Sequence, residues 1–133
     1  MSIAGAIYSK LSGTSAVTAL CGTRIYPGTG PENAPYPLVI TQQISAGVAD
    51  TRSLDGPARH FRTLYQIDVM GSTQASVQAL AKAIRQALDN VVNATWGGVS
   101  IKASMFDDQF DGNFEPAPNV YRIIQQYRIV YQE

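Results

Sequence analysis

Side chains that can carry acid–base or nucleophilic chemistry are few in this sequence and lie far apart along the chain. Histidine is the usual general base, and the chain has one, His60. A nucleophilic triad needs such a base within hydrogen-bond reach of Ser, Cys or Thr, and no Gly-x-Ser-x-Gly motif accompanies it. A lone histidine at the start of a predicted strand is typical of a solvated or interface residue. We therefore expect no catalytic residue and no cofactor.

Acidic side chains gather near the C-terminal third of the chain. Asp107, Asp108, Asp111 and Glu115 carry the oxygen ligands that a hard cation such as Ca²⁺ prefers. A calcium loop needs ligands at alternate positions, and Gln109-Phe110 interrupts that ladder. The pattern therefore favours a solvated loop or a subunit contact over residues 107–118, and no metal site.

Basic side chains cluster in and after a second polar segment, residues 46–59. Arg52, Arg59 and Arg62 are close in sequence, and such a cluster can contact phosphates. Asp50 and Asp55 lie among them and cancel much of the positive field. We interpret the cluster as a site of protein contacts or solvation, while binding of nucleic acid or of a small ligand stays open as the alternative.

The composition is that of one small domain, residues 1–133. Hydrophobic residues make up 45% of the chain and charged residues 15%, with ten Lys and Arg against ten Asp and Glu. A chain of this length can bury a core without disulfides, and its balanced charge argues against tight nucleic-acid binding by the monomer. Cys21 lies in an apolar pattern, so we expect it to be buried.

Targeting signals are not apparent in the sequence. The N-terminus mixes polar residues and glycines with its apolar ones, unlike a signal peptide. No apolar run approaches the about 20 residues of a membrane span. We therefore expect a protein that is made in a cytoplasm-like compartment and has no membrane partner.

Hydrophobic periodicity divides the chain into elements that would position these side chains. Helices are predicted at residues 2–12, at residues 14–22 and from Ser72 to Val91, and strands at 38–45, 60–70, 99–106 and 120–131. The segments 27–37, 46–59 and 107–118 are predicted as loops. The result is an α+β fold: N-terminal helices, then a β-β-α-β-β unit forming a mainly antiparallel sheet with a helix packed on one face.

The strands at 60–70 and 120–131 have the clearest alternation. One face of the first carries Phe61, Thr63, Tyr65, Ile67 and Val69. Its counterpart in the second carries Tyr121, Ile123, Gln125, Tyr127, Ile129 and Tyr131, with arginines and Gln126 opposite. Aromatic rings on a sheet can stack bases. Because these tyrosines share their face with isoleucines, we expect that face to be core against a helix.

The ordered set of segments resembles the family of small phage tail-completion proteins, also called tail terminator or tail-to-head joining proteins. The N-terminal half of the resemblance lies in the segments 17–27 and 34–40, where a proline leads into the first strand. The second half lies in the strand 65–70, which runs into a Ser-capped helix, and in the closing segment 121–129.

The resemblance implies a structural subunit of the virion. Such a protein assembles as a homo-oligomeric ring, commonly a hexamer, on the end of the tail tube. The ring ends tube growth and meets the head connector, and DNA passes through it without specific binding. Self, the tail-tube protein and the head-connector protein are the implied partners. The candidate assembly contacts lie in the segments 46–59 and 107–118 and are Asp50, Arg52, Asp55, Arg59, Asp107, Asp108 and Asp111.

Overall fold

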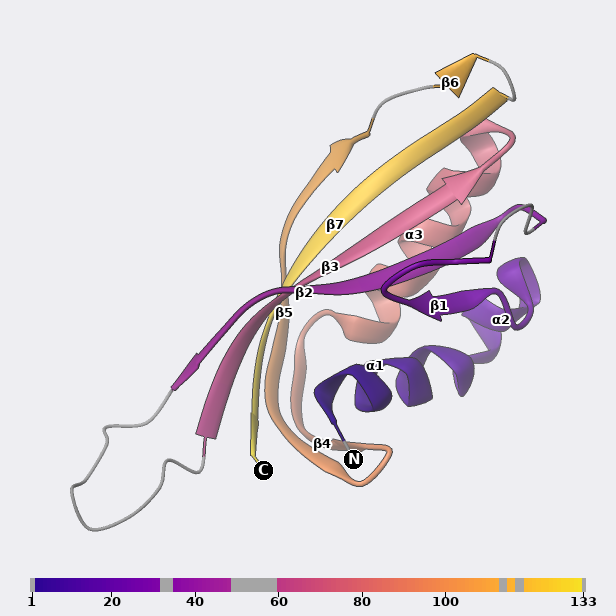
Figure 1. The fold of residues 1–133 in the computed structure, drawn as a ribbon. Coiled ribbons are helices and arrows are strands. Elements are labelled where there is room, and N and C mark those ends of the chain that lie inside the picture. The colour runs from indigo at the N-terminus through magenta and orange to yellow at the C-terminus, as the bar shows by residue number, and fades with distance from the viewer. Residues whose placement is uncertain (1, 32–34, 49–59, 113–114, 117–118, 133) are drawn as a thin grey trace, which may run out of the picture.

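The computed structural model describes residues 2–31, 35–48, 60–112, 115–116 and 119–132. Figure 1 shows one layer of strands with helices packed against it. The elements in chain order are α1 (Ile3–Ser12), α2 (Ser15–Cys21), β1 (Ile25–Pro27), β2 (Leu38–Val48), β3 (His60–Gly71), α3 (Gln74–Leu88), β4 (Val91–Trp96), β5 (Val99–Asp111), β6 (Glu115–Pro116) and β7 (Asn119–Gln132). The α+β class predicted from the sequence is confirmed.

The strands form one sheet in the order β1-β2-β3-β7-β5-β4, and β6 pairs with β7. β1 runs parallel to β2, and the other pairs are antiparallel. β7 has a partner on each side: it faces β3 from Tyr121 to Gln132 and β5 from Ile123 to Gln132. The mainly antiparallel sheet expected from the sequence is therefore present, with β7 between its two longest partners.

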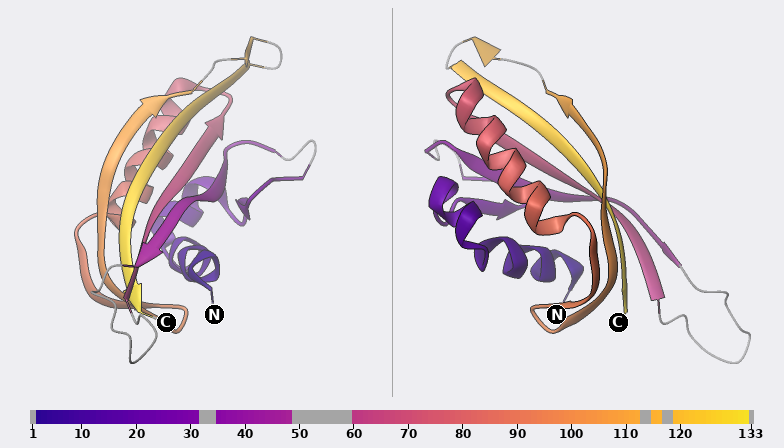
Figure 2. Two further views of the ribbon diagram at one scale, coloured as in Figure 1. Left: turned by 60° about the vertical axis from the view of Figure 1, so that its left-hand side comes forward. Right: turned by 180° about the vertical axis from the view of Figure 1, so that it is seen from behind.

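The helices of the described residues all pack on the same face of the sheet (Figure 2). Hydroxyl caps begin α1 and α3, and the cap of α3 is Thr73 and not the serine before it. The Ser2 hydroxyl accepts a hydrogen bond from the Gly5 N–H at 3.1 Å, and the Thr73 hydroxyl accepts one from the Ser76 N–H at 3.1 Å. α1 contacts β1 and β2 near one edge of the sheet and β4 at the other. The sheet therefore curls around its helices.

The core lies between α3 and the alternating faces of β3 and β7. Most of the predicted inward residues of these two strands are buried and meet the apolar stripe of α3, while Phe61 and Tyr121 are partly buried and pack against the core. The buried members are Thr63, Tyr65, Ile67, Val69, Ile123, Gln125, Tyr127, Ile129 and Tyr131 from the strands and Val77, Leu80, Ala81, Ile84 and Leu88 from the helix. Cys21 is also buried, as expected, and burial raises the pKa of its thiol.

One buried polar network joins the helix to the sheet. The Gln125 side chain has no exposed surface, and its Nε2 donates to the Ala81 carbonyl in α3 and to Gln109 Oε1 in β5, both at 2.9 Å. Its Oε1 accepts from the Tyr127 hydroxyl at 2.9 Å. Burial raises the pKa of Tyr127 above the usual 10.0, so this hydroxyl keeps its proton and acts as a donor. The amide thus fixes the position of α3 over β5 and β7.

Replacing Gln125 tests the network. Gln125→Leu keeps about the same volume but leaves the Tyr127 hydroxyl without its acceptor and removes the donor to Gln109 Oε1 and to the Ala81 carbonyl. We expect a loss of about 3 kcal/mol in the free energy of unfolding, measured by urea denaturation. Gln126→Leu, on the opposite face of the same strand, is the control and should change stability by less than about 1 kcal/mol. Equal effects of the two changes would contradict the structural role given to Gln125.

β5 corrects the prediction of a loop over residues 107–118. Residues 107–111, including Asp107, Asp108 and Asp111, form the C-terminal half of β5 and pair with β7 as far as Asp111 opposite Ile123. The acidic sequence favours a loop locally, but hydrogen bonding to the long β7 overrides that preference. Register shifts after Ile101 and after Phe106 accommodate the extra residues.

The ends of two other elements also differ from the sequence prediction. α3 ends at Leu88, and Asn90, with φ of 55°, turns the chain so that Val91 begins β4 instead of ending the helix. β4 was not predicted, because its residues 91–96 have little alternation. β2 continues to Val48, so residues 46–48 belong to a strand and not to the predicted loop 46–59.

Candidate functional site

The face of the sheet opposite the helices has no described helix over it (Figure 2). Residues that lie directly opposite each other in antiparallel strands share a face, which identifies its members from the register. This uncovered face carries Arg62, Leu64, Gln66, Asp68 and Met70 from β3, Arg122, Ile124, Gln126, Arg128 and Val130 from β7, and Met105, Asp108 and Phe110 from β5. Met105 and Phe110 are 53% and 44% exposed.

Two ion pairs hold charges on the uncovered face. Arg122 Nη2 lies 2.6 Å from Asp68 Oδ2, and the Asp68 side chain is only 8% exposed. Gln66 Nε2 donates to the other carboxylate oxygen, Asp68 Oδ1, at 3.0 Å. Arg128 Nε lies 3.0 Å from Asp107 Oδ1 in a more exposed pair. These pairs cancel locally, so the face has little net field despite its arginines.

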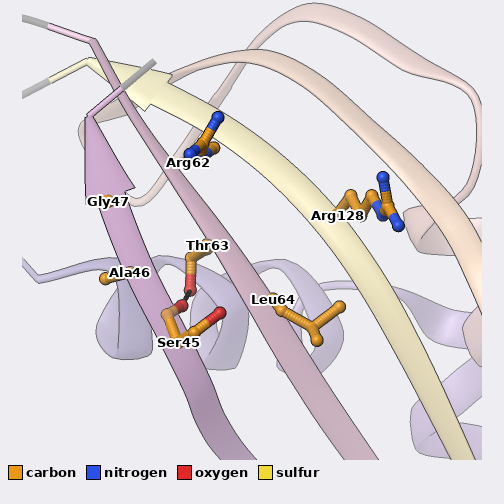
Figure 3. A pocket seen from close by; sticks show the side chains of 7 residues that line it. All are labelled: Ser45, Ala46, Gly47, Arg62, Thr63, Leu64 and Arg128. Atoms are coloured by element: carbon orange, nitrogen blue, oxygen red, sulfur yellow. Dashed lines mark hydrogen bonds between the residues drawn. The ribbon is translucent and has the colours of Figure 1, made fainter.

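A hollow of about 440 Å³ lies at the end of this face, where β2, β3 and β7 run side by side (Figure 3). Arg62 and Arg128 stand at its rim with Leu64 between them. Its lining residues are Ser45, Ala46, Gly47, Arg62, Thr63, Leu64 and Arg128.

Hydrogen bonding and the absence of one side chain shape the hollow. The Thr63 hydroxyl donates to the Ser45 carbonyl at 2.8 Å, beside the register shift in β2. Gly47 has no side chain, and the Arg62 side chain packs over its backbone, with Nε 3.6 Å from where a Cβ would lie. Arg62 has no ion pair with any described residue.

The structure separates the predicted site residues into two groups. Asp50, Arg52, Asp55 and Arg59 lie outside the described residues. Asp107, Asp108 and Asp111 lie on β5 and do not form one site: Asp107 is paired with Arg128, Asp108 lies opposite Gln126, and Asp111 lies opposite Ile123, a residue of the core face. Among the described residues, no group of three or more His, Cys, Asp and Glu side chains is arranged to hold a metal ion.

Tyr127 and Tyr131 of β7 belong to the core, and Tyr121 is partly buried against it. Tyr127 packs edge-to-face on Phe106 with ring centroids 5.8 Å apart, and Tyr131 stacks on Phe61 at 5.8 Å. Both are at most 6% exposed. Their rings are therefore covered and cannot serve as a platform for bases, in agreement with the core assignment from the sequence. The alternative of a binding module then rests on Arg62 and its neighbours.

Sequence reasoning missed the residues that make the uncovered face distinctive. Arg122 and Arg128 were placed on the outer side of the last strand, but their acidic partners come from strands distant in sequence. Met105 and Phe110 were assigned to a strand end and a loop. Alternation alone does not place Phe110, because the register shift between Phe106 and Asp108 moves it to the face opposite that of Phe106.

The fold is one found in virion components. It is similar to a chain in the structure described as "Virion of native gene transfer agent (GTA) particle", with a TM-score of 0.76 and 21% identity over 98% of this chain and 95% of that chain. A second solved structure is similar over 92% of this chain and 89% of its own, with a TM-score of 0.59 and 11% identity. No curated protein matches the sequence.

Residues 5–132 match the family model described as "Tail completion protein gp17", and the chain belongs to that family. The resemblance drawn from the sequence is thereby confirmed. The protein is a structural component of a phage-type tail, its place is in the virion, and it assembles with other tail or head proteins. None of the described helices has the length and apolar character needed to cross a membrane.

The Asp68–Arg122 pair supplies a test of the uncovered face as a structural unit. Arg122→Ala leaves a nearly buried carboxylate without its cation, and we expect a loss of about 2 kcal/mol in the free energy of unfolding. Arg128→Ala lies on the same face of β7, six residues further along the strand. It removes the exposed pair with Asp107 and should lower the free energy of unfolding by less than about 1 kcal/mol. Adding Asp68→Ala to Arg122→Ala should recover part of the loss. Urea denaturation would measure all three, and a larger effect for Arg128→Ala would contradict the assignment.

Proposed function

We propose that this chain caps the tail tube as a ring, ends tube growth and joins the tail to the head connector. The proposal rests on one observation: this member of a tail-completion family has a sheet face that no described helix covers. A domain with helices on one face only leaves the apolar side chains of Met105 and Phe110 exposed at two separate positions of β5, where a partner protein can cover them. Self, the tail-tube protein and the head-connector protein are the proposed partners.

The charge distribution supports a passage for DNA. The ten basic and ten acidic residues balance over the chain, and the described arginines Arg122 and Arg128 are neutralised by aspartates. Each phosphate neutralised by a free cation strengthens retention of DNA. A ring built from such subunits, hexameric as the family resemblance implies, allows DNA to pass without specific binding.

Assembly contacts extend, in this proposal, to the two segments chosen from the sequence. Asp50, Arg52, Asp55 and Arg59 belong to the predicted segment 46–59 and lie in sequence between the end of β2 at Val48 and the start of β3 at His60. Asp107, Asp108 and Asp111 lie on the part of β5 beyond its pairing with β4, where all three are exposed. Charged residues at such positions set the partner and the orientation of a contact more than its affinity.

Growth of tail tubes tests the cap. Tubes of the tail-tube protein encoded with this chain are polymerised with and without the purified chain, and their lengths and ends are recorded by electron microscopy. We expect the chain to stop elongation and to add a ring at one tube end. Continued growth at an unchanged rate, with no density at the end, would contradict the proposal.

A single substitution connects this activity to the uncovered face. Met105→Glu introduces a charge among the exposed apolar residues of that face, and we expect about tenfold more protein to be needed to stop tube growth. Leu20→Glu, at a 40% exposed position on the helix side, is the matched control and should terminate growth as the unmodified chain does. Both variants should give the unmodified far-ultraviolet circular dichroism spectrum.

Shortening the segment 46–59 tests its assigned contacts. Replacing residues 50–58 by a short Gly-Ser linker should leave a folded subunit, because loop length has a small effect on stability. The proposed contacts predict that particles made with this variant are not infectious and carry no completed tails. Infectious particles at normal titre would contradict the assignment of Asp50, Arg52 and Asp55.

A further inference from the structure

Two strands of the sheet are paired on one side only over their C-terminal halves. β1 covers β2 at residues 39–41, and no described residue pairs with β2 on that side from Gln42 to Val48. β4 covers β5 at residues 99–104, and the Asp89 carboxylate accepts from the Phe106 N–H at 2.8 Å; no described strand pairs with β5 on that side from Met105 to Asp111. The open half-edges have the same length. Open edges of this kind recruit further strands.

Backbone groups at the β5 edge point away from the sheet. The Gly112 N–H donates inward to the Arg122 carbonyl at 2.9 Å, and alternation then turns the N–H groups of Asp111 and Gln109 outward. The Gln109 N–H is held at 2.8 Å by the carboxylate of its neighbour Asp108, which is exposed. A partner strand can replace this local bond with a ladder bond.

The strand directions make the two edges complementary. Across the sheet, β2, β3, β7 and β5 alternate in direction, so β2 and β5 run opposite ways. A second copy placed beside β5 in the same orientation therefore presents its β2 antiparallel to β5. Both open halves are the C-terminal halves of their strands. In an antiparallel pair of these halves, β1 of one copy lies beyond one end of the paired residues and β4 of the other copy beyond the other end, so neither blocks the pairing.

Charge favours this contact over two copies of one edge. Arg62 packs across Gly47 beside the β2 edge, on the uncovered face, and has no ion pair with a described residue. Asp108 lies on the β5 edge and on the same face, opposite Gln126. Two β5 edges would instead bring aspartates together, and like charges repel at such distances.

We propose that the β2 edge of one copy, residues 42–48, pairs antiparallel with the β5 edge, residues 105–111, of the next copy, with Arg62 of the first meeting Asp108 of the second. The contact is head-to-tail, so repetition closes into a ring when the rotation per copy allows it. The inference rests on the proposed ring and specifies how its subunits join.

Cysteine cross-linking between copies tests the pairing. Ser45→Cys on the β2 edge and Phe110→Cys on the β5 edge are made as separate chains, mixed, assembled on tail tubes and treated with a short bis-maleimide. We expect a linked pair of chains from the mixture and little from either variant alone. The unmodified chain is the control for Cys21, which is buried.

The outcomes separate this inference from the function on which it rests. Tubes that terminate normally without any cross-link in the mixture would overturn the strand pairing and leave the ring intact. Linking of Ser45→Cys to itself, or of Phe110→Cys to itself, would replace it with a two-fold contact. Failure of the unmodified chain to form a ring or stop growth would overturn the proposed function itself.

Charge exchange gives an independent test. Arg62→Asp and Asp108→Arg, each alone, should reduce ring formation at tube ends by about tenfold, which corresponds to about 1.4 kcal/mol. The chain with both changes should regain most of the ring formation, because the two substitutions together would restore the ion pair with the charges exchanged. Lys82→Asp, an exposed change of the same kind on α3, is the control and should have no effect. A double variant as impaired as the single ones, though folded by circular dichroism, would overturn the Arg62–Asp108 contact.

Discussion

β7 is hydrogen-bonded to β3 on one side and to β5 on the other, and the rest of the structure depends on this double pairing. It keeps Gln125 in the centre of the core, where one amide reaches both α3 and β5. It also brings Arg122 to Asp68, more than fifty residues away in sequence. A change that disturbs β7 therefore affects the core and the uncovered face together, because successive residues of this strand serve opposite sides of the sheet.

The described helices pack on one face of the sheet only, so the two faces of the sheet differ in burial. The helices and the inward side chains of β3 and β7 supply the stability, and the opposite face is left with paired charges, glutamines and a few exposed apolar groups. A monomer gains nothing from exposing Met105 and Phe110 to water. In a protein of the virion, those residues are available to neighbouring proteins, because no described helix covers them.

Sequence predicted the parts of the fold whose local signals agree with their environment. The alternation in β3 and β7 and the apolar stripe of α3 are clear sequence signals, because each element has one face in the core and one face toward solvent. Asp107, Asp108 and Asp111 have the composition of a loop, and only pairing with a strand further along the chain makes them part of β5. The ion pairs of Arg122 and Arg128 could not be predicted for the same reason, because the register between distant strands decides which aspartate each arginine meets. The residues Asp50, Arg52, Asp55 and Arg59 remain predictions.

The irregularities in β2 and β5 have a consequence for the protein before it reaches a tail. Each register shift, between Gln43 and Ser45 and between Phe106 and Asp108, lies at the beginning of an open half-edge. Bulges twist a strand locally and make it a poor template for flat, indiscriminate stacking. Newly synthesised chains that joined edge to edge with the wrong rotation would grow into open-ended fibres. The two bulges and the Asp108 carboxylate over the Gln109 N–H oppose such indiscriminate pairing of copies.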